Sequence, residues 1–273
     1  PSAITLAGTI ETTDATIDLG SSTGGALSGP VSVSLAANTT LDSGTADLTL
    51  TGNIDGAYTL DLNSTGVTTL NAGIGTTSEL TALTTNAGGS TVLGGSTMSF
   101  SGALTFNDTV TTTTSTTLTA GSITTNSTVN AGTNALTLVT DSLALGGNVS
   151  GTSTLTIKPE TADATMGIAG GAGTLNLDGT ELGYLQDGFS RVYFGDSNTG
   201  ALTLGNGVAL TLNDSTTLTS GSTIDIAGDT SISGDDLQID AASPGTVSSI
   251  LSGTGDFALI GTSEMTLSAA NTF

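Results

Sequence analysis

The stretch Tyr58-Thr59-Leu60-Asp61-Leu62 carries apolar side chains at every second position, with Thr or Asp between them. Because successive side chains of a β-strand point to opposite faces, this pattern predicts a strand with one buried and one wet face. Gly, Asn and Asp interrupt the chain about every 6 to 12 residues, as turns require. The same alternation recurs at Ala3-Ile4-Thr5-Leu6, Ala15-Thr16-Ile17-Asp18-Leu19, Val31-Ser32-Val33-Ser34-Leu35, Asp47-Leu48-Thr49-Leu50, Leu155-Thr156-Ile157, Ala201-Leu202-Thr203-Leu204 and Ile224-Asp225-Ile226. The sequence therefore predicts an all-β fold of many short strands.

Loose internal repeats suggest how these strands are arranged. Ala103-Leu104-Thr105-Phe106-Asn107-Asp108 recurs as Ala209-Leu210-Thr211-Leu212-Asn213-Asp214. Each copy precedes a Thr-rich strand and then Leu118-Thr119-Ala120-Gly121-Ser122 or Leu218-Thr219-Ser220-Gly221-Ser222. Self-similarity built on short strands favours a solenoid, in which each repeat packs on the previous one.

A narrow coil also suits the size of the apolar residues. Aromatic residues make up only 3% of the chain, which is little for the broad core of a β-sandwich, the alternative fold. We therefore predict a right-handed parallel β-solenoid, or β-helix, of about 13 or 14 turns at about 20 residues per turn. We expect one continuous solenoid, with repeats over 1–154, a module carrying an insertion over 155–205 and further repeats over 206–273. The Thr-rich stretch 109–128 has no defined register, and its Thr runs are interpreted as wet-face strand residues.

One short helical insertion is expected near 179–188. Asp178 and Glu181 have the spacing of a capping box, and Gly188 stands where a glycine often follows a helix end. We expect its buried side to be formed by Leu182, Leu185 and Phe189.

The two basic residues of the chain flank this insertion. Lys158 precedes it and Arg191 follows it. Opposite charges within a few ångströms stabilise each other, so we expect each cation to pair with a carboxylate near the insertion. The candidate partners are Glu160, Glu181 and Asp187.

The charge of the chain excludes several classes of partner. The 273 residues carry a formal net charge of −22 and only two basic side chains. Phosphate binding requires Lys or Arg, so we expect no nucleic acid partner and no binding to anionic membranes. No apolar run approaches the roughly 18 residues of a membrane span, so we expect no membrane insertion. The chain starts at Pro1 without a basic segment typical of signal peptides, which indicates a mature product or a piece of a longer polypeptide.

No motif for catalysis or metal binding stands out. His and Cys are absent, which excludes Ser-His and Cys-His catalysis. Asp235-Asp236 is the one adjacent acidic pair, interpreted as a solvated turn, so we expect no enzyme activity. Gly170-Gly171-Ala172-Gly173-Thr174-Leu175 lacks the Asp of the nonapeptide calcium repeat. We expect no cofactor; calcium binding by turn Asp and Asn residues stays possible, with no site assigned.

Several stretches resemble modules of filamentous-haemagglutinin-like and autotransporter-type bacterial surface adhesins. They are Leu155-Thr156-Ile157-Lys158-Pro159, Met166-Gly167-Ile168, Asp187 to Gly195, Gly75 to Gly89, Gly102 to Asp108, Gly253-Thr254-Gly255-Asp256-Phe257 and Leu267 to Phe273. The resemblance implies right-handed β-helices, export to the cell surface, and roles in adhesion, biofilm or sheath formation. It also implies that this chain is an interior or processed portion, because the secretion domain and membrane barrel of such proteins are not in it.

The sequence thus predicts a structural module of an extracellular bacterial filament, sheath or adhesin stalk. Met265-Thr266-Leu267-Ser268 still has a strand pattern, so we expect uncapped strand edges that pair head-to-tail with further copies or further repeats. A glycan- or surface-binding adhesin module is the first alternative, and would use exposed Tyr58, Tyr184 or Tyr193. A β-helix polysaccharide-degrading enzyme is the second alternative.

Overall fold

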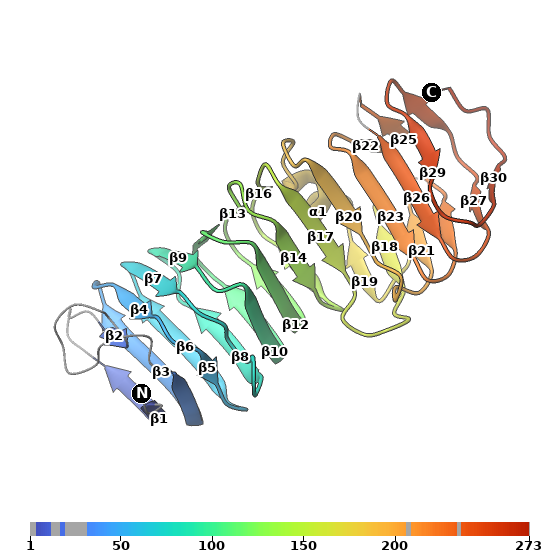
Figure 1. The fold of residues 1–273 in the computed structure, drawn as a ribbon. Coiled ribbons are helices and arrows are strands. Elements are labelled where there is room, and N and C mark those ends of the chain that lie inside the picture. The colour runs from blue at the N-terminus through green and yellow to red at the C-terminus, as the bar shows by residue number, and fades with distance from the viewer. Residues whose placement is uncertain (1–3, 12–16, 20–31, 206–208, 234–235, 273) are drawn as a thin grey trace. The chain divides into compact units, whose positions relative to one another are not determined.

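The computed structural model describes residues 4–11, 17–19, 32–205, 209–233 and 236–272. These residues form a parallel β-solenoid with one short helix, which confirms the expected fold class (Figure 1). Its strand pairs are parallel and join segments about one turn apart in the sequence. Two compact units divide the chain: 1–135 with 144–149, and 136–143 with 150–273.

The first unit stacks its strands in two sheets. The order in the larger sheet is β1 (Ile4–Glu11), β3 (Val33–Gly44), β6 (Thr59–Ser64), β8 (Leu80–Thr85), β10 (Thr97–Phe106) and β12 (Thr116–Thr125), with β5 (Ile54–Asp55) beside β3. The order in the smaller sheet is β2 (Ile17–Leu19), β4 (Leu48–Leu50), β7 (Val67–Leu70), β9 (Ser90–Leu93), β11 (Thr109–Thr112) and β13 (Val129–Asn130).

The second unit has three sheets. The first contains β14 (Leu136–Val139), β17 (Thr154–Lys158), β20 (Arg191–Phe194), β23 (Thr216–Ser220), β26 (Leu237–Ala241) and β29 (Phe257–Leu259). The second contains β19 (Leu175–Leu177), β18 (Met166–Ile168), β21 (Leu202–Leu204), β24 (Ile224–Ile226), β27 (Gly245–Val247) and β30 (Met265–Leu267). The third contains β22 (Leu210–Leu212), β25 (Thr230–Ile232) and β28 (Leu251–Gly253). Strands β15 (Leu143–Leu145) and β16 (Val149–Ser150) lie at the unit boundaries along the chain.

The core consists of columns of apolar side chains, one from each turn. Leu60, Leu83 and Leu104 occupy matching positions on β6, β8 and β10 and are at most 1% exposed. Leu83 pairs with Leu104, and Leu218 pairs with Ile239, in each case 21 residues later. The period agrees with the assumed turn length, and period-two alternation places every second side chain in the column.

The described part of the chain makes fewer turns than expected. Each unit contributes six strands to its largest run of paired strands, one strand for each turn. Leu155 on β17 pairs with Val192 on β20, 37 residues later. The intervening insertion lengthens one turn instead of adding turns, so dividing the chain length by a uniform period overestimates their number.

The helix of this insertion, α1 (Gly179–Tyr184), is shorter than expected. Asp178 accepts hydrogen bonds from the Thr180 and Glu181 backbone, and the Glu181 side chain accepts one from the Asp178 N–H, which confirms the capping box. The prediction of Gly188 at the helix end was wrong: α1 ends at Tyr184, and the C-cap Leu185 is extended and donates its N–H to the Leu182 carbonyl.

The buried stripe proposed for the insertion forms only in part. Leu182 and Leu185 are half-buried, and Phe189, which is 4% exposed, lies beyond the helix. A six-residue helix offers less than two full turns, so it cannot present a continuous apolar face.

The two copies of the Ala-Leu-Thr repeat are not structurally equivalent. Leu104 lies on β10 in the larger sheet of the first unit, whereas Leu210 lies on β22 in a three-stranded sheet. Both positions require only a strand followed by a polar corner, so the same sequence is compatible with different sides of the coil.

Candidate functional site

The last described turn exposes an apolar surface. Leu259 on β29 pairs with Ile239, and Leu267 on β30 pairs with Val247. Ile239 and Val247 are fully buried, whereas Leu259 is 39% exposed and Leu267 is 40% exposed. The residues of this turn therefore continue the core columns, and no further turn covers them among the described residues.

This surface coincides with strand edges. Among the described residues, β29 and β30 end their sheets, so each has a paired strand on one side only. The edge of a parallel strand presents N–H and C=O groups that another strand can pair with. Asp256 and Glu264 are exposed on the same turn and make the surroundings of this edge acidic.

Several carboxylates serve as clamps between consecutive turns. Five Asp side chains accept backbone N–H groups from the turn that follows, at 2.8 to 3.1 Å: Asp47 from Val67, Asp55 from Thr77 and Ser78, Asp141 from Glu160 and Thr161, Asp225 from Thr246, and Asp229 from Ile250. A charged acceptor on a corner N–H stabilises a turn that lacks a regular ladder bond. These acidic residues therefore have a structural role.

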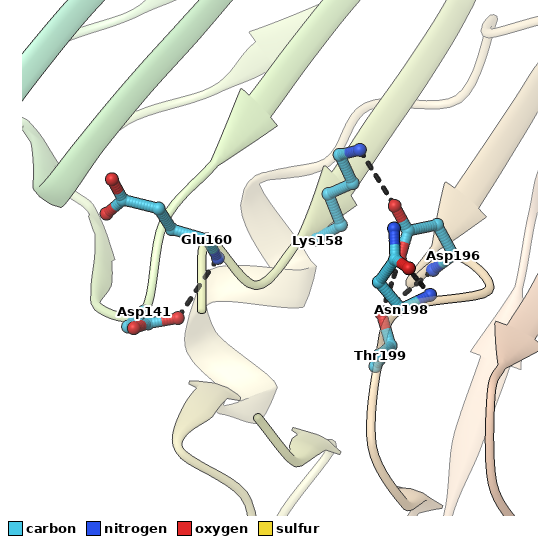
Figure 2. A network of polar contacts seen from close by, with 6 residues as sticks. All are labelled: Asp141, Lys158, Glu160, Asp196, Asn198 and Thr199. Atoms are coloured by element: carbon cyan, nitrogen blue, oxygen red, sulfur yellow. Dashed lines mark hydrogen bonds and ion pairs between the residues drawn. The ribbon is translucent and has the colours of Figure 1, made fainter. Parts of the chain in front are cut away.

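A polar network fastens the start of the insertion (Figure 2). Lys158 Nζ lies 2.8 Å from Asp196 Oδ2, and Asp196 Oδ1 accepts the Asn198 N–H at 2.8 Å. Asp141 Oδ1 accepts the Glu160 N–H at 3.0 Å. Lys158 pairs with a carboxylate as expected, but its partner Asp196 was not among the named candidates, because the corner after β20 brings Asp196 to the lysine.

The network changes the acidity of Asp196. Partial burial opposes ionisation of Asp196, but the hydrogen bonds from Lys158, the Asn198 N–H and Thr199, with the charge of Lys158, outweigh it and lower its pKa below 3.8. Asp196 therefore stays ionised and paired with Lys158 at neutral pH.

Arg191 likewise pairs with a carboxylate outside the expected set. Its guanidinium lies 3.9 Å from Asp236 and donates a 3.1 Å hydrogen bond to Thr217 Oγ1. The expected partners Glu181 and Asp187 belong to the insertion, whereas Asp236 comes from a later turn. Parallel stacking brings later turns beside β20, which sequence proximity alone does not reveal.

Asp108 is a buried carboxyl group of the first unit. Its side chain accepts hydrogen bonds from Thr85 and Thr91 at 3.0 Å, and the residue is 4% exposed. Desolvation raises the pKa of Asp108 above 3.8, although these hydrogen bonds oppose the shift. Because both partners are Thr hydroxyls, the arrangement is a satisfied corner of the core.

The Thr run is not entirely on the wet face. Thr112 and Thr116 are 7% and 2% exposed, and their hydroxyls donate to the carbonyls of Ala131 and Gly95 at 3.1 Å. The interpretation of the whole run as wet-face residues was therefore wrong at these two positions, which lie at corners of the coil. Register through this stretch is defined by Val110, which pairs with Val129.

The three tyrosines proposed for glycan binding lie on separate elements. Tyr58 is 39% exposed and lies beside β6, Tyr184 ends α1, and Tyr193 lies on β20 between Thr156 and Thr217. Asp235 lies outside the described residues, so the Asp235-Asp236 pair is described only at Asp236. Within the described ranges, no group of three or more acidic, His or Cys side chains could hold a metal ion.

A search of the described helices found none that is long and apolar enough to cross a membrane. Comparisons with protein-family models, with characterised proteins and with solved structures found no match for this chain.

Proposed function

We propose that this chain is a structural module of an extracellular bacterial filament, sheath or adhesin stalk, extended by strand pairing at its open turn. One observation carries the proposal: Leu259 and Leu267 continue buried columns but are about two fifths exposed. Burial of such side chains under a further parallel turn is favoured by the hydrophobic effect.

The proposed occupant of this surface is the first turn of another copy. Ile4 and Ile10 on β1 stand in register with the buried Val33 and Leu41, so the apolar positions of the β1 sequence match buried positions of β3. Contact between the last turn of one copy and the first turn of the next is heterologous, and repeated contacts of this type build open filaments. Further repeats of a longer polypeptide would cover the same surface in the same way.

The net charge supports end-to-end rather than lateral association. A charge of −22 makes the sides of two solenoids repel each other. The open turn is also acidic, through Asp256 and Glu264, so repulsion between ends must be screened. At about 0.15 M salt the Debye length is about 8 Å, so the repulsion between ends is screened at longer separations while the apolar contact attraction is not.

The acidic residues described above fit a scaffold. Asp47, Asp55 and Asp141 are acceptors for backbone N–H groups of the next turn. A protein whose carboxylates fasten its own turns gains mechanical cohesion from them, which suits a filament or stalk. The proposal assigns the chain no catalytic step and places it outside the cell, in agreement with the resemblance to surface adhesins.

Electron microscopy of the purified chain tests this proposal. We expect fibres whose length increases with protein concentration at 0.15 M salt, a working ionic strength chosen from the screening argument. Leu267→Asp adds a charge to the uncovered column and should abolish the fibres, whereas Thr266→Asp adds the same charge on the exposed wet face of β30 and should not. Single particles at all concentrations and salt levels would refute assembly from separate copies.

A further inference from the structure

A cavity lies between α1 and β22 in the second unit. Its volume is about 260 Å³, and its wall includes Leu182 of α1, Leu185 just past the end of α1, Phe194 of β20 and Leu212 of β22. Phe194 and Leu212 are buried core residues, whereas Leu182 and Leu185 are half-buried. These four side chains form an apolar part of the wall.

The origin of the cavity lies in the insertion. Strand β22 is the first of its three-stranded sheet, so one of its sides has no strand partner within that sheet. Residues of α1 and of β22 line the same space, and α1 has no fully buried residue. A short helix with half-buried leucines fills less volume than a stacked strand, so a gap remains beneath it.

The cavity is open to the surface and has one anionic group. Exposed Gly183, Thr211 and Asn213 form part of its wall. Asp214 lines it as well, is 9% exposed, and accepts the Gly188 N–H at 2.8 Å through Oδ1. No basic residue lines the cavity among the described residues.

We infer that this cavity binds a small organic cation with an apolar body. The volume exceeds the roughly 150 Å³ of an apolar cavity that accommodates benzene. Leu182, Phe194 and Leu212 would contact the apolar part of the ligand, and the carboxylate of Asp214 would accept a charge-assisted hydrogen bond from its ammonium group. The field of a chain with net charge −22 concentrates cations near the opening. This binding is independent of the proposed assembly.

Three probes of similar shape and different charge test the inference. Benzylamine, benzyl alcohol and benzoate are titrated into the chain at about 0.15 M salt, with binding followed by saturation-transfer NMR and by the shift in melting temperature. We expect benzylamine to bind at least about tenfold more tightly than benzyl alcohol, because its hydrogen bond to Asp214 is charge-assisted. Benzoate should bind least. Equal binding of benzoate and benzylamine would overturn the inference.

Matched variants separate the cavity from general attraction to an acidic surface. A Cβ added at Gly183 meets no other atom within 4 Å, so the backbone accepts a side chain there, and Gly183→Phe adds a ring on a residue of the cavity wall. This variant should lose benzylamine binding, whereas Thr180→Phe places the same ring on α1 away from the cavity wall and should bind normally. Asp214→Asn should remove the preference for benzylamine over benzyl alcohol. Unchanged binding in Gly183→Phe, or no binding by the original chain, would overturn the inference.

Discussion

The uncovered leucine on β29 gives a quantitative test of end-to-end stacking. Leu259 is 39% exposed, whereas Ile239, its partner one turn earlier, is fully buried. Complete burial of a Leu side chain contributes roughly 2–3 kcal/mol, so covering the exposed two fifths contributes about 1 kcal/mol to association. We predict that Leu259→Ala weakens each end contact by about this amount, and somewhat more if a cavity remains in the joint.

The critical concentration for fibre formation measures this effect. A loss of about 1 kcal/mol corresponds to roughly a fivefold rise, and a residual cavity would bring the rise to about tenfold. Light scattering against protein concentration at constant salt gives the critical concentration directly. The same substitution at Ile239 should instead reduce the free energy of unfolding by about 2–5 kcal/mol, because it creates a cavity in a closed column.

Ile260→Ala is the matched control. Ile260 is 54% exposed and follows Leu259 directly, just past the end of β29, where it is not paired in register with a core residue of β26. Removal of its apolar side chain should leave the critical concentration within about twofold of the original value, since surface substitutions rarely exceed 0.5 kcal/mol. Equal effects of Leu259→Ala and Ile260→Ala would show that general surface hydrophobicity, and not column stacking, drives association.

Three further predictions concern the polar groups. Lys158→Met should lower the free energy of unfolding by about 0.5–1 kcal/mol at pH 7. Because the pKa of Asp196 is lowered, the ion pair stabilises the fold above pH 3.8, and this stabilisation is lost as the pH falls through the folded-state pKa of Asp196. Denaturant unfolding across about pH 2–7 should therefore show the difference in stability between the variant and the original chain disappearing in acid. Asp141→Ala should destabilise the chain by about 1–2 kcal/mol and accelerate hydrogen exchange at the Glu160 amide. Asp141→Asn keeps an acceptor for this amide and should lose much less stability. Similar exchange rates in both variants would show that the Asp141 side chain does not hold the Glu160 amide. Asp108→Asn should stabilise the chain by up to about 1 kcal/mol at pH 7. Because the pKa of Asp108 is raised, its carboxyl group contributes favourably to stability below pH 3.8, and this contribution is lost as the pH rises through its folded-state pKa. Thermal unfolding should therefore show the stability gain of the variant disappearing in acid.

The period-two pattern was sufficient to predict the solenoid because it reports directly on the direction of each side chain. Leu60 and Leu62 alternate with Thr59 and Asp61, and the structure buries the first two completely or almost completely. The capping box was equally predictable, since Asp178 and Glu181 interact within one helical turn. Features of this kind depend on residues a few positions apart.

Features that depend on neighbouring turns were predicted less well. Lys158 and Arg191 were expected to pair with carboxylates such as Glu160, Glu181 or Asp187, but they pair with Asp196 and Asp236. Thr116 was taken for a wet-face residue, yet it is buried with its hydroxyl donated to the carbonyl of Gly95, 21 residues earlier. The period of about 20 residues was the one signal in the sequence for contacts between turns. Loops of unequal length shift the corners relative to this period, so it does not predict which residues contact each other.

By itself, the sequence determined the strand class, the parallel coil, the short capped helix and the strongly acidic surface, because alternation, capping and charge are local or additive properties. Only the tertiary structure decided which carboxylates fasten successive turns, that Asp108 is buried, that a cavity lies under α1 and that Leu259 and Leu267 continue open columns. The physical reason is register, because contacts between turns depend on the exact number of residues in every intervening loop. In addition, an apolar residue at a strand position has the same sequence pattern whether or not another turn covers it.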